Sequence, residues 1–460
     1  MMELKNKSVL VLGLGETGLS MLRYLKERGA RLSVADSRKN PPGLGEARKY
    51  VIEPHIFCGA FDDELFMGVD LVAVSPGVSL KDPVIARAVA CGIPVVGDIE
   101  LFAWTLPREN RPKVLAITGS NGKTTVTSMV AHLCRAAGKG AIAAGNISPA
   151  VLDALALSGN GQPDIWVLEL SSFQLESTLT LNPDAATVLN VSEDHLDRYT
   201  DINEYAIAKS RIFNGAAVQI LNRDDSRSMA MRREETASLT FGQGVPDSEN
   251  DFGTVERQGE VWLVQGTQLL LKASELQTTG LHNVSNALAA LALCRAIDLP
   301  MDGLLAALRR FEGLPHRVER IAEIGDVIYY DDSKGTNVGA TLAALEGLGR
   351  KIVLIAGGEG KGQDFSPLKS SVDRHARGVV LIGRDAHLIE AALQGSDIPR
   401  MRAESMRDAV GKAAQLAQAG DAVLLSPACA SFDMFRNYEH RAEMFIEAVH
   451  EVNPGAVWHH

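Results

Sequence analysis

The chain has 460 residues, of which 46% are hydrophobic and 22% charged, a composition typical of a globular enzyme with two to four domains. Its 57 acidic and 46 basic residues give a net charge of −11, which argues against general nucleic-acid binding. No apolar run has the length of a membrane span, which is about 18 residues or more, so we expect neither a membrane-spanning segment nor export. The five cysteines are odd in number and lack CxxC spacing, which favours buried free thiols and a reducing cytoplasm. They are Cys58, Cys91, Cys134, Cys294 and Cys429.

The first segment of the chain alternates apolar strands and helical patterns. Residues 7–37 predict strand, turn, helix and strand, and further strands are expected at 69–77 and 92–98. This alternation is typical of a small doubly wound sheet. We therefore predict an N-terminal domain over residues 1–98, followed by a polar, Pro-containing linker over 101–111.

Two more α/β segments follow. Strands expected at 114–118, 164–172, 185–192 and 217–222 and a helix at 283–298 define a central domain, residues 99–313. Residues 223–280 interrupt it with short polar strands, a small β excursion. Strand patterns at 326–333, 351–358, 378–384 and 421–428, each followed by a helical pattern, define a C-terminal domain, residues 314–460. The expected fold class is α/β with three domains: a Rossmann-like sheet, a P-loop ATPase-type sheet with the β excursion, and a second Rossmann-like domain.

The most informative stretch is TGSNGKTT, residues 118–125, between an apolar strand and a helix. Backbone N–H groups of such a Gly-rich loop and of the helix N-terminus surround phosphates, the Lys places a positive charge at the β/γ position, and a Thr hydroxyl can contact Mg²⁺. Ile117 stands where the usual pattern has its first Gly. An ordinary βα turn has no need for a Lys just inside a helix N-terminus, where the dipole disfavours it. The loop predicts ATP binding.

A second glycine pattern, GLGETG at residues 13–18, matches the dinucleotide fingerprint, and Asp36 closes the next strand. Alone it predicts NAD and a nicotinamide-dependent oxidoreductase. About 98 residues would hold only one mononucleotide half, however, so the bound nucleotide can equally be part of a substrate. A non-catalytic nucleotide-binding regulator is a third possibility.

Three further residues have a functional and a plain interpretation. Glu169 ends an apolar strand, where an acid can hold the metal of a phosphate loop, or lie on the surface. His195 in EDHLD can be a metal ligand or a structural histidine. Lys209 reads from its neighbours as an exposed helical lysine with an apolar stem.

Seven motifs in order resemble those of the Mur ligase family, the ATP-dependent amino-acid-adding enzymes of peptidoglycan precursor synthesis. They are TGSNGKTT, LELSSFQLE (168–176), EDHLDRY (193–199), HNVSNALAA (282–290), LPHRVE (314–319), DDSKGTN (331–337) and SPACASFDMF (426–435). The GLGETG start resembles the branch that adds D-glutamate, and the DNPR motif of the diaminopimelate-adding branch is absent. Folylpolyglutamate synthases share the ATP-binding core but lack the additional N-terminal sheet.

The resemblance implies a reaction and its cofactors. The carboxylate of UDP-N-acetylmuramoyl-L-alanine (UDP-MurNAc-L-Ala) attacks the γ-phosphate of ATP, and the amine of D-glutamate then displaces phosphate from the acyl phosphate. Two Mg²⁺ ions are implied, with Thr124, Glu169, His195 and a carbamylated Lys209 as ligands. Carbamylation is chemically sensible because burial lowers a lysine pKa and leaves an amine that can react with CO₂. The resemblance carries no nucleic-acid or membrane partner, and we expect a monomer in the cytoplasm.

The resemblance also assigns residues to each substrate. Lys123, Lys209, His195 and His316 are the implied catalytic residues, with His316 assisting the amine step. ATP is assigned to Gly119, Ser120, Asn121, Gly122, Lys123, Thr124, Thr125, Asn283, Asn286, Arg317 and Asp332. Asn283 and Asn286 lie three apart and so share a helix face toward the adenine, and Asp332 is assigned to the ribose.

The remaining assignments concern the UDP-sugar and D-glutamate. The UDP-substrate is assigned to Glu16, Thr17, Asp36, Ser37, Arg38, Gly77 and Asn146, where Glu16 replaces a usual apolar residue and adds a charge near the uridine. D-Glutamate is assigned to Thr336, Lys361, Ser431 and Phe432. Because the site combines residues of several domains, a closing motion with hinges near 98–112 and 313–317 is expected.

Overall fold

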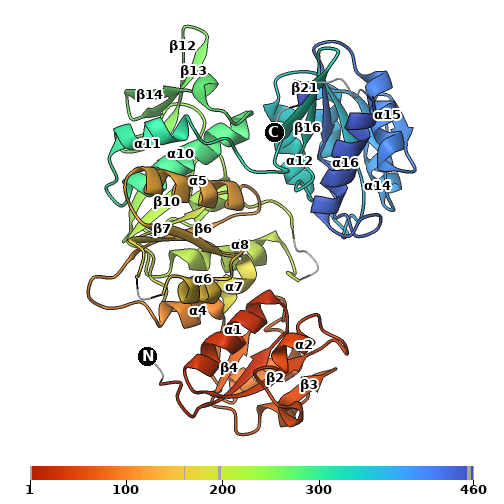
Figure 1. The fold of residues 1–460 in the computed structure, drawn as a ribbon. Helices are drawn as coiled ribbons and strands as arrows, with labels where there is room; N and C mark the ends of the chain where they lie inside the picture. Colours follow the sequence, from red (N-terminus) through yellow and green to blue (C-terminus); the bar gives the residue numbers. More distant parts are fainter. Residues whose placement is uncertain (1–2, 160, 195–197, 453–456, 459–460) are drawn as a thin grey trace.

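The computed structural model describes residues 3–159, 161–194, 198–452 and 457–458. The chain forms three α/β bodies: the N-terminal body lies below the central one and the C-terminal body lies beside it (Figure 1). The α/β fold class is confirmed: each body has its own sheet, two of them parallel and one mixed. No helix among these residues is long and apolar enough to cross a membrane.

The N-terminal sheet is entirely parallel, with the order β3-β2-β1-β4-β5. Its central strands are continuous apolar runs that are buried on both faces, as parallel sheets require. The strands are β1 (Ser8–Leu12), β2 (Arg31–Asp36), β3 (Ile56–Cys58), β4 (Leu71–Val74) and β5 (Val95–Val96). The helices are α1 (Glu16–Glu27), α2 (Leu44–Ala47), α3 (Pro83–Ala90) and α4 (Asp98–Ala103).

The central sheet is also parallel, with the order β11-β10-β9-β6-β8-β7, and the antiparallel sheet β12-β13-β14 is the expected β excursion. The strands are β6 (Lys113–Thr118), β7 (Ala141–Gly145), β8 (Ile165–Glu169), β9 (Ala185–Val188), β10 (Val218–Asn222), β11 (Ala237–Phe241), β12 (Phe252–Arg257), β13 (Glu260–Gln265) and β14 (Gln268–Lys272). The helices are α5 (Lys123–Ala136), α6 (Val151–Leu157), α7 (Ser172–Glu176), α8 (Ile202–Ser210), α9 (Ser226–Ala230), α10 (Leu281–Arg295) and α11 (Met301–Leu308). Helices α5, α10 and α11 share one hydrophobic core, which fixes the two helices that carry nucleotide-binding motifs.

The C-terminal sheet has the order β19-β18-β17-β20-β16-β15-β21, in which β15 pairs antiparallel with β16 and β21 and the other strands are parallel. The strands are β15 (Glu319–Ile324), β16 (Val327–Asp331), β17 (Ile352–Ala356), β18 (Ala376–Leu381), β19 (Arg400–Arg402), β20 (Ala422–Leu425) and β21 (Val457–Trp458). The helices are α12 (Val338–Gly347), α13 (Leu368–His375), α14 (Ala386–Ala392), α15 (Met406–Leu416) and α16 (Tyr438–Val452).

Two local expectations are wrong. The predicted linker over 101–111 begins inside α4, where Leu101 and Phe102 are fully buried, because α4 packs against α6 of the central body. The free thiols are not all buried: Cys58 and Cys91 are exposed, since the first lies on the edge strand β3 and the second caps α3.

Candidate active site

The phosphate loop connects β6 to α5 and is shaped by its last glycine. Gly122 has φ +82°, a conformation that favours glycine, and a Cβ there would stand 2.7 Å from Asn286 Oδ1, so a side chain would displace the Asn286 amide. Helix α5 then begins at Lys123, with its free N–H groups directed at the loop.

The segment after β9 supports this loop, and sequence reasoning assigned it no role. The Asn121 backbone N–H donates to Asn190 Oδ1 at 2.8 Å, and Asn190 Nδ2 donates to the Asn121 carbonyl at 3.2 Å. Ser120 Oγ donates to the Ser192 carbonyl at 3.0 Å. The available signal was the polar NVS directly after an apolar strand, beside the loop in a parallel sheet.

Two lysines converge on one carbonyl of the loop. Lys123 Nζ lies 3.0 Å and Lys209 Nζ 2.9 Å from the Gly119 carbonyl oxygen. Lys209 is 1% exposed, so the plain interpretation of an exposed helical lysine is wrong. Burial and the neighbouring charge of Lys123 hold the pKa of Lys209 well below its ordinary value, although Asp194 and Glu169 oppose this shift. Two cations cannot share this acceptor without repulsion, which favours a neutral Lys209 amine.

Glu169 carries an unsatisfied buried oxygen. Its side chain is 2% exposed, so it is not a surface acid. Oε1 accepts from Asn146 Nδ2 at 2.9 Å, whereas Oε2 is buried without a hydrogen-bond partner. A buried carboxylate oxygen of this kind fits a cation, and the residues present therefore suit Mg²⁺.

For the other implied metal ligands among the described residues, the structure shows no such unsatisfied oxygen atom. Thr124 Oγ1 accepts a hydrogen bond from Arg317 Nη2 at 2.8 Å, so this hydroxyl is engaged by the C-terminal body. His195 lies outside the described residues. A separate cluster of ligand-type atoms, from His316, Glu319 and Asp331, lies within 4.8 Å, but a hydrogen bond between His316 Nδ1 and Asp331 Oδ2 at 2.7 Å already occupies two of these atoms.

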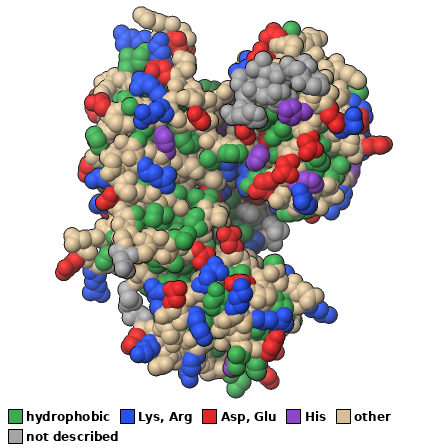
Figure 2. All heavy atoms as spheres, in the orientation of Figure 1, with side chains coloured by type: hydrophobic (Ala, Val, Ile, Leu, Met, Phe, Trp, Pro, Cys, Tyr) green, Lys and Arg blue, Asp and Glu red, His purple; other side chains and the backbone are tan. Residues whose placement is uncertain are grey.

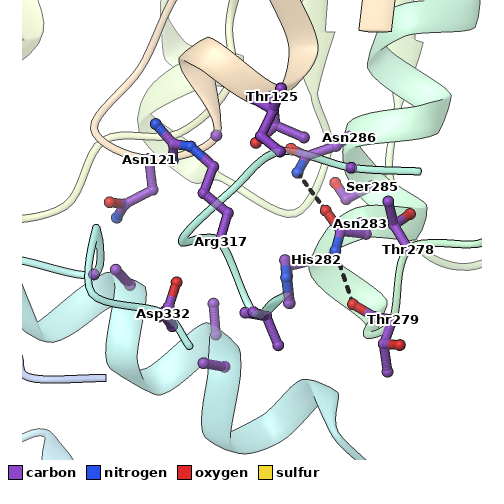
Figure 3. Close-up of a pocket in the computed structure, with 18 of the residues that line it drawn as sticks. Asn121, Thr125, Thr278, Thr279, His282, Asn283, Ser285, Asn286, Arg317 and Asp332 are labelled. Atoms are coloured by element: carbon purple, nitrogen blue, oxygen red, sulfur yellow. Dashed lines mark hydrogen bonds between the residues drawn. The ribbon is translucent and has the colours of Figure 1, made fainter. Parts of the chain in front are cut away.

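A cavity of about 830 Å³ opens beside the phosphate loop, between the central and C-terminal bodies. Figure 3 shows Arg317 extending toward the loop, with the asparagines of α10 across from it and Asp332 entering from the C-terminal body. The structure brings seven of the assigned ATP residues to its wall: Asn121, Gly122, Thr125, Asn283, Asn286, Arg317 and Asp332. Gly119, Ser120, Lys123 and Thr124 lie in or directly after the same loop.

The two asparagines of α10 form a chain instead of acting side by side. Asn286 Nδ2 donates to Asn283 Oδ1 at 3.2 Å, and Asn283 Nδ2 donates to the Thr279 carbonyl at 2.8 Å (Figure 3). Asn283 is buried, so it orients the Asn286 amide in the cavity wall.

Two side chains of the C-terminal body reach across to the phosphate loop. Besides Arg317, Asn337 Nδ2 donates to Asn121 Oδ1 at 3.1 Å and lies 3.4 Å from Asp194 Oδ2; Asn337 was not assigned from sequence. Asp332 Oδ2 accepts from Ser426 Oγ at 2.7 Å. Burial raises the pKa of Asp332 to about 7, against the effect of that hydrogen bond.

The GLGETG loop has the close packing that its glycines predict. A Cβ on Gly18 would lie 1.8 Å from the Gly13 carbonyl oxygen, so only glycine fits at that position. A Cβ on Gly15 would meet nothing within 4 Å, so the space beside Gly15 is open. Asp36 at the end of β2 accepts from the Leu14 N–H at 2.7 Å and from the Arg38 guanidinium at 2.8 and 2.7 Å. Although burial opposes it, these bonds lower the pKa of Asp36.

The other assigned UDP-substrate residues surround this loop and its neighbours. Glu16 is exposed and its Oε1 accepts from Ser148 Oγ of the central body at 3.4 Å. Ser37, Gly77 and Asn146 are exposed and Thr17 is partly buried. Gly77 and Asn146 follow β4 and β7, at the carboxyl ends of two separate sheets.

The assigned D-glutamate residues lie on loops at the carboxyl ends of β16, β17 and β20, three adjacent strands. Glu359 and Ala430 pair through two backbone hydrogen bonds, which holds the Lys361 loop beside buried Ser431. Lys361 is exposed with φ +50°, and Phe432 is 67% exposed. None of Thr336, Lys361, Ser431 and Phe432 is among the lining residues of the cavity described above.

Lys334 lines the cavity but was not assigned, although it stands in the DDSKGTN motif. Its Nζ lies 3.5 Å from the centroid of the Tyr438 ring, and burial, together with Arg317, lowers its pKa to about 8. Tyr438 also meets the His316 ring edge to face at 6.1 Å. The hydrogen bond to Asp331 raises the pKa of His316, which makes this imidazole a stronger base.

Three family models cover most of the chain. They are described as the Mur ligase MurD-like N-terminal domain (residues 7–97), the Mur ligase middle domain (117–294) and the Mur ligase glutamate ligase domain (316–429). The chain belongs to the Mur ligase family.

Full-length curated relatives are more specific. A protein of Methylobacillus flagellatus is 56% identical over 449 residues, covering 98% of each chain, and one of Nitrosomonas europaea is 55% identical over 456 residues, covering 97% of each. Both are named UDP-N-acetylmuramoylalanine--D-glutamate ligase. Among solved structures, MurF ligase from Thermotoga maritima in complex with ADP has a TM-score of 0.61 at 17% identity, covering 97% of this chain and 96% of its own, a similarity of fold.

Proposed function

We propose that the chain is a ligase that adds D-glutamate to UDP-MurNAc-L-Ala with ATP, through an acyl phosphate, in cytoplasmic peptidoglycan precursor synthesis. The observation that carries this proposal is the cavity at the phosphate loop, whose wall combines α10 of the central body with Arg317 and Asp332. The relatives with the D-glutamate ligase name, above 50% identical over nearly the whole chain, give the choice of substrates.

ATP is proposed to lie along this wall, with its phosphates on residues 119–125 and its adenine at Asn286. Lys123 then turns from the Gly119 and Ser120 carbonyls, each 3.0 Å away, to the β- and γ-phosphates. In phosphoryl transfer, the protein chiefly aligns the transferred phosphoryl group and neutralises its charge. Arg317 supplies a second cation from the other domain.

Two Mg²⁺ ions are proposed to bind, with Glu169, Thr124, His195 and a carbamylated Lys209 as their ligands. When bound, they would neutralise phosphate charge. The partnerless Glu169 oxygen supports the first ligand, and the lowered pKa of the buried Lys209 supports the carbamate. Incubation with ¹³C-labelled bicarbonate should give a carbamate NMR signal that Lys209→Met lacks; equal signals from both proteins would exclude this site.

The UDP-substrate is proposed to bind at the GLGETG loop, with uracil near Asp36 and Arg38 and the diphosphate near Gly77 and Asn146. D-Glutamate is proposed to bind at the loops of Thr336, Lys361, Ser431 and Phe432. Since none of these four residues lines the cavity, closure of the domains proposed at 1–98, 99–313 and 314–460 would have to bring the amine to the acyl phosphate and exclude water. A monomer is sufficient for this scheme.

The test is phosphate release from ATP with UDP-MurNAc-L-Ala and Mg²⁺ across a panel of D- and L-amino acids. We expect release with D-glutamate and little with L-glutamate or L-alanine. Release with another amino acid alone would contradict the assigned acceptor, and tight NADH binding without ATP-dependent release would contradict a ligase.

A further inference from the structure

One arginine of the central body fastens a loop of the N-terminal body. Arg198 Nη1 donates to the Pro76 carbonyl at 2.7 Å, and Arg198 Nη2 donates to the Val78 carbonyl at 3.1 Å. These carbonyls flank Gly77, and no site has been assigned to Arg198. The guanidinium thus grips both sides of the loop proposed to meet the diphosphate.

The loop that Arg198 holds is also joined to the glycine loop. Ser75 Oγ donates to the Gly13 carbonyl at 3.0 Å, and the Val78 N–H donates to the Ser75 carbonyl at 3.0 Å. A shift of residues 76–78 would therefore be passed on to residues 13–18. Both loops that surround the proposed UDP site depend on one anchored turn.

The arginine itself is held from the central body. Its side chain is 12% exposed and pairs with Glu176 Oε2 at 3.2 Å, while Glu176 Oε1 accepts from the Tyr199 hydroxyl at 2.7 Å. The guanidinium carbon lies 4.0 Å from the centroid of Phe173. This fixes the plane of the guanidinium, which a lysine ammonium would not reproduce.

A second interaction, an exposed ion pair, also connects the N-terminal body to the central body. Lys81 Nζ lies 2.6 Å from Glu204 Oε1 and 3.5 Å from the Arg198 carbonyl oxygen, but the side chains of Lys81 and Glu204 are 53% and 35% exposed. An exposed pair of this type contributes little, and no contact of the Arg198 guanidinium given above involves Lys81, so Lys81→Met is a control that removes a cation at this boundary but leaves those contacts in place.

We propose that Arg198 is a positioning residue for the UDP-substrate. It fixes the Gly77 loop, and thereby places the diphosphate correctly relative to the phosphate loop of the central domain. Arg198 follows His195 by three positions on the EDHLDRY segment, so the same short stretch serves the metal side and the UDP side. This inference rests on the proposed function, because the ligand at the Gly77 loop is the UDP-substrate assigned there.

The experiment compares Arg198→Met, Arg198→Lys, Glu176→Gln and Lys81→Met with the unchanged protein. We expect Arg198→Met to lower kcat/KM for UDP-MurNAc-L-Ala by roughly 100-fold, the order of a displacement of about 1 Å, with KM for ATP within twofold. Arg198→Lys should recover only part of this loss. Glu176→Gln should also lower kcat/KM for UDP-MurNAc-L-Ala, but by less than Arg198→Met. Lys81→Met should change neither kcat/KM for UDP-MurNAc-L-Ala nor KM for ATP.

Calorimetric titration with UDP alone, and thermal unfolding, accompany the kinetics. We expect weaker UDP binding by Arg198→Met with unchanged ATP binding. If Arg198→Met does not fold, Glu176→Gln alone decides the matter. Unchanged kinetic constants for the UDP-substrate in every variant that folds would overturn the proposal and leave the ligase function intact. Equal losses of affinity for ATP and UDP would do the same. Absence of phosphate release by the unchanged protein would instead overturn the ligase function.

Discussion

Replacement of Lys209 by methionine separates its chemistry from its contribution to folding. The side chain is fully buried at the phosphate loop and its Nζ donates to the Gly119 carbonyl at 2.9 Å. Methionine has a similar length and fills the same space without the amine. We expect Lys209→Met to fold normally and to lose activity by roughly 10- to 100-fold at saturating Mg²⁺, the order found for groups that support a metal.

The stability change can be worked out from the contacts. A hydrogen bond from a neutral amine contributes about 0.5–1.5 kcal/mol, but folding must also hold the Lys209 amine in its neutral form below its ordinary pKa, a cost that methionine does not carry. The Gly119 carbonyl would not be left unpaired, because Lys123 Nζ also donates to it at 3.0 Å. The two effects therefore nearly cancel, and the free energy of unfolding should change by no more than about 1 kcal/mol or increase.

The pH dependence has a defined sign. The folded pKa of Lys209 is lowered from 10.5, so between the two values the unfolded chain binds a proton that the folded chain releases. The stability of the unchanged protein should consequently rise with pH through this window, relative to Lys209→Met.

Phosphate release in buffer with bicarbonate measures the first effect, and urea unfolding in CO₂-free buffer from neutral to alkaline pH measures the second, with exposed Lys139→Met as the control in both. More than a tenth of the activity remaining in Lys209→Met would refute the catalytic role. A loss of stability well above 1 kcal/mol would refute the argument about the shared carbonyl.

Three further substitutions test other parts of the site. Gly122→Ala should raise KM for ATP, because a Cβ would stand 2.7 Å from Asn286 Oδ1, while Gly138→Ala, with a similar φ of +78° and open space around it, should lose only stability, by about 1–2 kcal/mol; equal KM values would show that the steric conflict is irrelevant. Glu169→Gln should keep its bond to Asn146 but raise the Mg²⁺ concentration for half-maximal activity roughly 10- to 100-fold, and an unchanged Mg²⁺ requirement would remove Glu169 from the metal site. Burial lowers the pKa of His282 to about 4 from 6.5, so the stability of the unchanged protein should fall as pH drops through that window; urea unfolding should show this slope weakened in His282→Asn, and identical slopes would contradict the assignment.

Much of the fold could be predicted from sequence because its strands are buried on both faces. Runs such as residues 114–117 and 352–356 are continuously apolar and end in polar or glycine-rich loops, a pattern typical of parallel strands buried on both faces. The expected linker was misread for the opposite reason. Leu101 and Phe102 are apolar residues before a polar stretch, and only the surface of α6 shows that they are buried.

The site was predictable where one local segment makes it and not where distant segments meet. The phosphate loop is local, and its Gly122 is required by its own backbone. The partners of Arg198 lie about 120 positions earlier in the chain, and Asn337 meets Asn121 across 216 positions. The spacing of Asn283 and Asn286 predicts that both face a ligand, but Asn283 donates to the Thr279 carbonyl and accepts from Asn286, a contact that the spacing does not indicate.

The contacts that cross to the phosphate loop also suggest why the nucleotide should organise the domains. Arg317 donates to the Thr124 hydroxyl and Asn337 to the Asn121 amide oxygen, both neutral acceptors. Hydrogen bonds from a guanidinium to phosphate are charge-assisted and about twice as strong as neutral ones. ATP would therefore offer Arg317 a better partner than Thr124, and would release the Thr124 hydroxyl for the metal. The same exchange that completes the proposed metal site would draw the C-terminal domain onto the γ-phosphate, so nucleotide binding and closure are expected to be one coupled step.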